Sequence, residues 1–274
     1  MKQNIIKISK FEVSNIHPFF LIAGPCSIES KDHAINHAGV INEICKKLSI
    51  NFVYKSSFDK ANRSSKYSVR GIGLEKGLNI LSDVNKEFNI PTLTDVHESY
   101  QCKEVANVVD IIQIPAFLCR QTDLLTAAAE TQKIINIKKG QFLAPWDMEN
   151  VINKVLDVGN NNLMLTERGT SFGYNTLVSD MRSIPQMSKF GFPIIFDATH
   201  SVQQPGGLGL TSGGQREFVS ILSRAAVSIG ISGLFIEAHE NPDKAPSDGP
   251  NMIKLSELKK LLTKLIEIDK IIKV

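Results

Sequence analysis

Eight short apolar runs alternate with segments of helical periodicity along most of the chain, and this alternation restricts the fold more than any other feature. The runs are Phe19–Cys26, Phe52–Ser57, Pro91–His97, Val109–Ala116, Lys133–Lys139, Leu163–Arg168, Pro193–His200 and Gly233–Glu240. Strands joined through helices pair in parallel, because a parallel pair needs a crossover of about a dozen residues or more. Eight such units predict one closed (β/α)₈ barrel, a TIM barrel, spanning residues 1–274 as a single domain.

The segments between and around these runs complete the predicted barrel. Helical patterns cover Lys31–Leu48, Leu74–Phe88, Gln121–Glu130, Met148–Gly159 and Gln215–Ile229. Residues 1–18 precede the first run and are predicted to form a short N-terminal hairpin that caps the barrel floor. From Lys254 onward, leucines gather on one helical face opposite lysines, which indicates a helix of the outer ring. A membrane-surface helix is the alternative for this tail.

Composition excludes several classes of protein. The 274 residues are 42% hydrophobic, enough for a sizeable core, and the net charge of +3 is too small to indicate a nucleic-acid or membrane partner. No apolar run approaches the ~18 residues that a membrane span requires. The four cysteines form no C-x-x-C pair, and Cys45, Cys102 and Cys119 are expected to pack inertly. We therefore expect a soluble, cytoplasmic protein.

Polar residues stand at the C-terminal ends of all eight predicted strands. They include Cys26, Lys55, Ser57, Asp95, His97, Gln113, Asn136, Lys138, Arg168, His200, Glu237 and His239. Burying so many polar and charged groups costs several kcal/mol each unless they are paired or bind a ligand. At the C-terminal end of a barrel they would line one pocket, where barrel enzymes have their active sites. A layer of mutually satisfied ion pairs is the structural alternative.

Five of the basic residues predict an anionic ligand. Lys55, Lys60, Arg63, Lys138 and Arg168 lie on or just after three of the predicted strands, and like charges that converge repel one another unless an anion joins them. Arginine adds a bidentate fit to phosphate or carboxylate. A Schiff-base aldolase, with Lys55 or Lys138 as the amine, is a different enzyme class that fits the same residues. A barrel that binds a sugar phosphate without turnover is a third reading.

Four residues have the chemistry of a metal site. Cys26, His200, Glu237 and Asp248 offer a thiolate, an imidazole and two carboxylates, which suit Zn, Fe(II), Mn or Co. They are far apart in the sequence, so spacing alone leaves the metal open. Asp248 lies in one of two long loops, Ser201–Gly214 and Asn241–Asn251, that follow late strands and are expected to lie over the active site.

A series of motifs in chain order resembles one enzyme family. The motifs are Ile22-Ala-Gly-Pro-Cys-Ser-Ile-Glu-Ser30, Tyr54-Lys-Ser-Ser-Phe-Asp-Lys-Ala-Asn-Arg-Ser-Ser65, Thr94-Asp-Val-His-Glu98, Ile112-Gln-Ile-Pro-Ala-Phe-Leu118, Asn136-Ile-Lys-Lys-Gly-Gln-Phe142, Phe196-Asp-Ala-Thr-His-Ser201, Ser212-Gly-Gly-Gln-Arg216 and Leu234-Phe-Ile-Glu-Ala-His239. Together they resemble 3-deoxy-D-manno-octulosonate 8-phosphate synthases. The related synthases that use erythrose 4-phosphate carry Lys-Pro-Arg-Thr where this chain has Lys60-Ala-Asn-Arg63, which favours the octulosonate enzymes.

The resemblance implies an activity and an assembly. These synthases condense phosphoenolpyruvate with D-arabinose 5-phosphate and water in lipopolysaccharide sugar biosynthesis, and they are homotetrameric barrels. Members with Cys on the first strand are metal-dependent, whereas metal-free members have Asn there. Cys26 therefore implies a divalent metal held with His200, Glu237 and Asp248.

The resemblance also implies residue roles. Lys55 and Lys60 would hold the phosphoenolpyruvate carboxylate, and Ser57, Lys138 and Arg168 its phosphate. The implied arabinose phosphate contacts are Asn62, Arg63, Ser64 and Asp95, with Arg63 and Ser64 reaching a neighbouring subunit's site. Gln113 is a further substrate-binding residue, and Lys60, Asp95 and His200 would act in catalysis.

Overall fold

The computed structural model describes residues 3–63, 65–207 and 213–273, and its centre is a closed barrel of eight parallel strands. The barrel strands are β3 (Phe20–Gly24), β4 (Phe52–Lys55), β5 (Thr92–Asp95), β6 (Ile111–Ile114), β7 (Ile134–Lys138), β8 (Leu163–Glu167), β11 (Ile194–Asp197) and β14 (Gly233–His239). Each pairs with the next, and β14 closes the barrel by pairing with both β11 and β3. The predicted (β/α)₈ barrel is confirmed.

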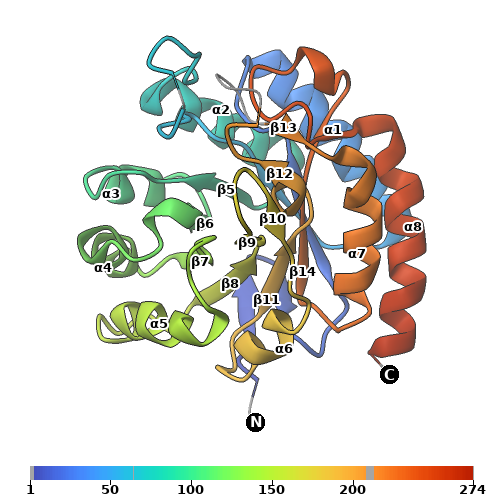
Figure 1. The fold of residues 1–274 in the computed structure, drawn as a ribbon. Coiled ribbons are helices and arrows are strands. Elements are labelled where there is room, and N and C mark those ends of the chain that lie inside the picture. Colours follow the sequence, from blue (N-terminus) through green and yellow to red (C-terminus); the bar gives the residue numbers. More distant parts are fainter. Residues whose placement is uncertain (1–2, 64, 208–212, 274) are drawn as a thin grey trace.

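Eight helices surround the barrel in the part of the chain that the structure describes. They are α1 (Lys31–Leu48), α2 (Leu74–Phe88), α3 (Gln101–Ala106), α4 (Thr122–Glu130), α5 (Met148–Leu156), α6 (Ser183–Ser188), α7 (Val219–Val227) and α8 (Leu255–Ile272). Figure 1 shows α3, α4 and α5 on one side of the barrel and α7 and α8 on the other. Each longer helix turns an apolar face inward, as with Leu78, Leu81 and Val84 of α2, spaced three apart.

A two-stranded hairpin precedes the barrel. Strands β1 (Ile6–Ile8) and β2 (Phe11–Val13) pair antiparallel, and Ile6, Ile8 and Val13 are buried. These side chains form one apolar cluster with interior residues near the N-terminal ends of the strands, such as Phe20 of β3. The hairpin therefore fills the end of the barrel opposite the polar strand ends.

The C-terminal helix belongs to the outer ring. Leu258, Leu262 and Leu265 of α8 are fully buried in the main core, and α8 packs against α7 and α1. This apolar face is covered by protein, as the outer-ring interpretation predicts. No helix among the described residues combines the length and the apolar character needed to cross a membrane.

The barrel strands end earlier than the apolar runs. The first run was expected to reach Cys26, but β3 ends at Gly24, and β11 ends at Asp197 although its run continues to His200. The ladder of hydrogen bonds stops where the chain turns outward toward its helix, while the apolar run continues. Several predicted site residues consequently lie on connecting segments, where the alternation of strand faces no longer holds. Short strands β9 (Thr170–Ser171), β10 (Leu177–Val178), β12 (Gln203–Gln204), β13 (Gly213–Gly214) and β15 (Ile253–Lys254) lie in these segments.

Candidate active site

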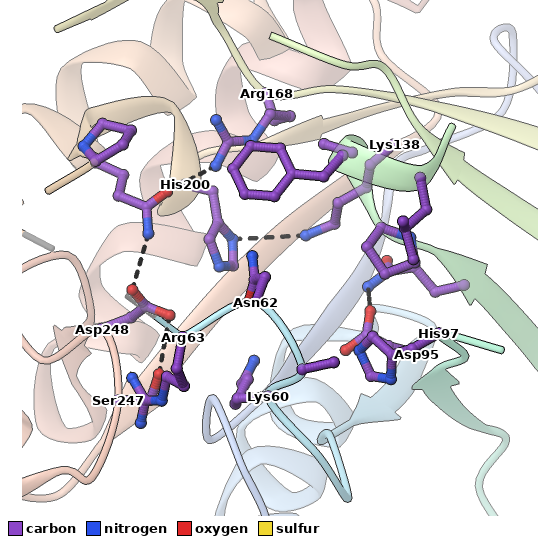
Figure 2. Close-up of a pocket in the computed structure, with 18 of the residues that line it drawn as sticks. Lys60, Asn62, Arg63, Asp95, His97, Lys138, Arg168, His200, Ser247 and Asp248 are labelled. Carbon is purple, nitrogen blue, oxygen red and sulfur yellow. Dashed lines mark hydrogen bonds between the residues drawn. The ribbon is translucent and has the colours of Figure 1, made fainter. Parts of the chain in front are cut away.

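A cavity of about 440 Å³ opens at the C-terminal ends of the barrel strands (Figure 2). Ten of the predicted site residues line it: Lys55, Lys60, Asn62, Arg63, Asp95, Gln113, Lys138, Arg168, His200 and Asp248. Both long loops contribute, through Gln203, Pro205 and Gly206 from the first and Ser247 and Asp248 from the second. The first of these loops was expected to extend over Ser201–Gly214, and residues 208–212 of it lie outside the described residues.

Three predicted residues lie behind the cavity lining. Ser57 is fully buried, and its hydroxyl donates a hydrogen bond to the Asp95 carboxylate. Cys26 and Glu237 are buried deeper, in contact with lining residues: the Cys26 thiol with Asp248 and the Glu237 carboxylate with Lys55. Ser64, a predicted arabinose phosphate contact, lies outside the described residues.

Two of the lysines are held by buried carboxylates. Lys55 Nζ lies 2.6 Å from Glu237 Oε1, and Lys138 Nζ lies 2.5 Å from Asp197 Oδ2. Both ammonium groups also approach the Phe235 ring, at 5.3 and 3.8 Å from its centroid. Burial lowers the pKa of Lys138, and the adjacent Asp197 carboxylate opposes this effect. Each lysine is thereby held in position by a carboxylate.

Two other cations have no carboxylate partner within 4 Å among the described residues, namely Lys60 and Arg168. Arg168 Nη2 donates to Gln203 Oε1 at 2.8 Å, but its buried Nη1 has no hydrogen-bond partner within residues 3–63, 65–207 and 213–273. Burial also lowers the pKa of Arg168. A buried donor left without an acceptor is costly, so this side of the cavity is built to receive an anion.

Asp95 is the terminus of a hydrogen-bond chain that crosses the barrel interior. Thr166 Oγ1 donates to Asn136 Oδ1 at 2.7 Å, and Asn136 Nδ2 donates to Gln113 Oε1 at 2.9 Å. Gln113 Nε2 then donates to Asp95 Oδ1 at 2.5 Å. Burial would raise the pKa of Asp95, but Lys55, Lys60 and Lys138 hold it well below its ordinary value. Asp95 is thus an oriented, ionised carboxylate at the edge of the cavity.

The four predicted metal ligands converge beside this cavity. One ligand atom each of Cys26, Glu237 and Asp248 lies within 4.8 Å of the others, and Cys26 Sγ lies 3.2 Å from Asp248 Oδ2. His200 Nε2 lies 3.6 Å from Glu237 Oε2, while its Nδ1 is 2.7 Å from Asp197 Oδ2. A carboxylate on one imidazole nitrogen leaves the other free to bind a metal.

Two features of this cluster indicate a place for a cation. Glu237 Oε2 is buried and has no hydrogen-bond partner among the described residues. Burial and the Glu237 charge raise the pKa of the Cys26 thiol, so the proton stays on sulfur until a cation replaces it. A thiol, an imidazole and two carboxylates around an unsatisfied oxygen fit a divalent transition metal.

Residues 6–274 match the sequence profile of the DAHP synthetase I family. The chain belongs to the DAHP synthetase I family. A Bartonella henselae protein named 2-dehydro-3-deoxyphosphooctonate aldolase is 64% identical over 265 residues, covering 97% of this chain and 95% of that protein. Proteins of the same name from Bartonella quintana and Brucella anthropi are 62% and 60% identical, covering 97% and 98% of this chain and 95% and 97% of theirs.

In this DAHP synthetase I family chain, one residue expected at the cavity points elsewhere. His239 was aligned with Glu237 on one strand face, but its Nε2 lies 2.9 Å from Glu29 Oε1, and its ring packs beside His33 of α1. The strand ends at His239, and there the strict alternation of faces ends too. His239 does not line the cavity.

Sequence reasoning missed two residues that hold the site of this family member together. Asp197 bridges Lys138 and His200 through one carboxylate oxygen. Gln203 connects Arg168 to Asp248, since its amide nitrogen donates to Asp248 Oδ1 at 2.8 Å (Figure 2). Asp197 was part of a quoted motif and ends a buried strand, so its position alone could have indicated a role. Gln203 lies in a loop, and the sequence around it did not indicate a role.

Proposed function

We propose that this chain is a 3-deoxy-8-phosphooctulonate synthase. It condenses phosphoenolpyruvate with D-arabinose 5-phosphate and water, and it releases 3-deoxy-D-manno-octulosonate 8-phosphate and phosphate for lipopolysaccharide sugar biosynthesis. The observation that carries the proposal is the cavity itself: in the part of the chain that the structure describes, Arg168 and Lys60 have no carboxylate within 4 Å, and both line the cavity together with an ionised Asp95. The name shared by relatives of at least 60% identity over nearly the whole chain agrees with it.

The cations bind phosphoenolpyruvate in the inner part of the cavity. Arg168 presents its free guanidinium nitrogen to the phosphate, and Lys138, fixed by Asp197, adds a second charge. Lys60 and Lys55 bind the carboxylate. Neutralising both anionic groups at fixed positions lets a second anionic substrate enter without strong repulsion.

Residues nearer the cavity mouth bind the sugar phosphate. Asn62 and Arg63 line the cavity on the segment after β4, and Arg63 donates to the carbonyl oxygens of Val69 and Pro246. Asp95 accepts hydrogen bonds from the sugar hydroxyls. With Ser64, Arg63 is proposed to contact the phosphate bound by a neighbouring subunit.

The reaction forms one carbon–carbon bond and breaks one carbon–oxygen bond. The enol carbon of phosphoenolpyruvate attacks the sugar aldehyde, water adds to the phosphate-bearing carbon, and phosphate departs as that C–O bond breaks. Asp95, His200 and Lys60 all line the cavity, and in this proposal they hold or move protons and stabilise charge. A divalent metal bound by Cys26, His200, Glu237 and Asp248 would act as a Lewis acid on a substrate or water oxygen.

Three further statements belong to the proposal. The metal is Zn, Fe(II), Mn or Co, because the ligand set contains one sulfur and one nitrogen. The enzyme is a homotetramer, as the resemblance implies. It acts in the cytoplasm, in accord with four cysteines that are all buried as free thiols.

The test measures phosphate release from phosphoenolpyruvate with arabinose 5-phosphate, before and after chelation and after metal is added back. We expect loss on chelation and recovery with metal. Erythrose 4-phosphate in place of arabinose 5-phosphate should give little release, and substantial release would favour the other branch of the family. Cys26→Asn with unchanged activity and unchanged chelator response would contradict the metal role.

Borohydride treatment in the presence of substrate separates the Schiff-base alternative. Lys55 and Lys138 are both ion-paired, so we expect no inactivation and no added mass on either lysine. A reduced adduct on one of them would show that the chain forms an imine. Binding of both substrates without phosphate release would instead support a barrel that binds without turnover.

A further inference from the structure

A second cluster of metal-ligating side chains lies outside the cavity. Its members are Glu29, His33, His37, His239 and Glu240, and none of them lines the pocket. His33 and His37 are four residues apart on α1, so their rings lie on one face of the helix, with centroids 4.2 Å apart. Half of the six histidines of the chain therefore meet at this one place.

Three imidazole rings surround a single carboxylate oxygen. Glu240 Oε2 lies 3.0 Å from His37 Nε2 and 3.4 Å from both His33 Nε2 and His239 Nδ1. The side chains of His37 and His239 are each only 4% exposed, and that of His33 is 14% exposed. Glu240 itself is 57% exposed, so the cluster is open to solvent on one side.

The hydrogen bonds around the rings decide which nitrogens are free. His37 Nδ1 lies 3.3 Å from the His33 carbonyl oxygen, which can only accept, so Nδ1 carries the proton and Nε2 has a lone pair. This lone pair faces a carboxylate oxygen at 3.0 Å. Two acceptors at that distance repel each other unless a cation lies between them.

His33 brings a second imidazole to the same carboxylate, because its Nε2 lies 3.4 Å from Glu240 Oε2. Neither ring nitrogen of His33 has a hydrogen-bond partner in the described part of the chain. The cluster therefore holds two imidazoles, each with one nitrogen beside the Glu240 carboxylate.

His239 has a different role in the cluster. Its Nδ1 accepts a hydrogen bond from the Asn241 backbone N–H at 2.9 Å, so Nε2 carries the proton and donates to Glu29 Oε1 at 2.9 Å. Both of its nitrogens are thus engaged. It fixes Glu29, whose Oε1 lies 3.7 Å from His33 Nε2, as an additional negative charge.

We propose that His33 Nε2, His37 Nε2 and the Glu240 carboxylate form a second, structural site for a divalent metal of the zinc class. Two imidazoles and one carboxylate suit Zn²⁺, and the fourth position is open to solvent beside Glu240. The charges of Glu240 and Glu29 balance the charge of the ion.

The proposed ion would fasten an active-site segment to an outer helix. Glu240 directly follows β14, and the segment after it carries Asp248 into the cavity. Its bond to α1 fixes the beginning of that segment. The metal of the cavity and the metal of this cluster would therefore bind opposite ends of the same nine residues, 240–248.

The test counts zinc bound per chain after equilibration with zinc and removal of free metal. To remove the cavity site from the count, it uses a full-length protein in which Cys26→Ser is combined with His200→Ala, and every Cys26→Ser protein named below carries both changes. We expect one zinc per chain in Cys26→Ser and none in Cys26→Ser with His37→Gln. Cys26→Ser with His17→Gln is the matched control, because His17 lies in the N-terminal segment away from the cluster, and it should keep its zinc.

A second variant guards against misfolding. Glu240→Gln changes a largely exposed side chain and should weaken zinc binding by at least about 10-fold. With Co²⁺ as the probe, Cys26→Ser should give a spectrum without sulfur-to-cobalt charge transfer, and His37→Gln should abolish the remaining bands. Equal zinc binding with and without His37→Gln and Glu240→Gln would overturn the proposal, whatever the activity of the cavity site.

Discussion

At the scale of single residues, the cations of the cavity are held in two ways. Lys138 is fixed by the Asp197 carboxylate and His200, whereas the guanidinium of Arg168 has, among the residues that the structure describes, only the neutral amide of Gln203 as a hydrogen-bond partner. A buried cation with a carboxylate partner stabilises the fold only weakly, and one without a partner is a cost to it. The position of Arg168 is therefore explained by binding and not by stability.

Arg168→Met should separate these two effects. We expect phosphate release to fall by about 100-fold or more in kcat/KM, because an electrostatic contact to the reacting phosphate is lost. The free energy of unfolding should fall by no more than about 1 kcal/mol, the worth of the hydrogen bond to Gln203. Urea unfolding and steady-state kinetics measure the two quantities. The control is Arg182→Met, at an arginine 84% exposed on the surface, and a strongly destabilised Arg168→Met would contradict this explanation.

Asp95→Asn should change how stability depends on pH. The folded-state pKa of Asp95 is depressed by Lys55, Lys60 and Lys138, so its charge stabilises the fold above the unfolded pKa of about 4. As the pH falls below that value, Asp95 becomes protonated in the unfolded chain but stays ionised in the folded chain. The wild type therefore loses stability. The variant should be less stable at pH 6, and the difference should shrink toward pH 3. Urea unfolding across this range is the measurement, with exposed Asp157→Asn as control, and a difference independent of pH would refute the argument.

At the scale of elements, the sequence predicted the barrel, and most of the residues predicted for the site do meet at one cavity, because strand ends follow a simple rule. Parallel strands bring their C-terminal ends to one edge, and Lys55, Asp95 and Lys138 each end a strand and line the cavity. The rule does not hold for residues beyond the last backbone hydrogen bond between paired strands. Ser57 lies beyond β4 and turns behind Asp95, and His239 turns toward α1, because connecting segments follow local hydrogen bonds that alternation does not encode.

The N-terminal hairpin packs at the barrel floor, where the sequence predicted a cap. Ile8→Ala removes a fully buried side chain at the barrel floor and should lower the free energy of unfolding by about 2–5 kcal/mol. Because the cavity lies at the other end of the barrel, kcat should stay the same under conditions where the variant is folded. Ile5→Ala, at a side chain 53% exposed, should change stability by less than about 0.5 kcal/mol. Equal losses in the two variants would mean that the hairpin does not plug the barrel.

At the scale of the whole molecule, exposed aromatic side chains gather on two segments that follow neighbouring barrel strands. Four aromatic side chains on the segments after β7 and β8 are more than half exposed: Phe142, Trp146, Phe172 and Tyr174. The two segments lie side by side, since the Ser171 N–H donates to the Gln141 carbonyl oxygen at 2.9 Å. Exposed aromatic groups that gather in one region mark association surfaces more often than free surface. In the proposed homotetramer, a second copy of the chain would cover these aromatic side chains.

Phe172→Ser combined with Tyr174→Ser should therefore weaken the assembly. Phe172 is 71% exposed and Tyr174 96% exposed in the single chain, so replacing them leaves the core of each subunit intact. Analytical ultracentrifugation should show a tetramer for the wild type and smaller, concentration-dependent species for the double variant. Tyr100→Ser removes an aromatic ring that is 70% exposed after β5 and should leave the tetramer unchanged. Because Arg63 is proposed to contact a neighbouring subunit's substrate, phosphate release should fall as the double variant is diluted, and a fully tetrameric double variant would exclude this surface as the interface.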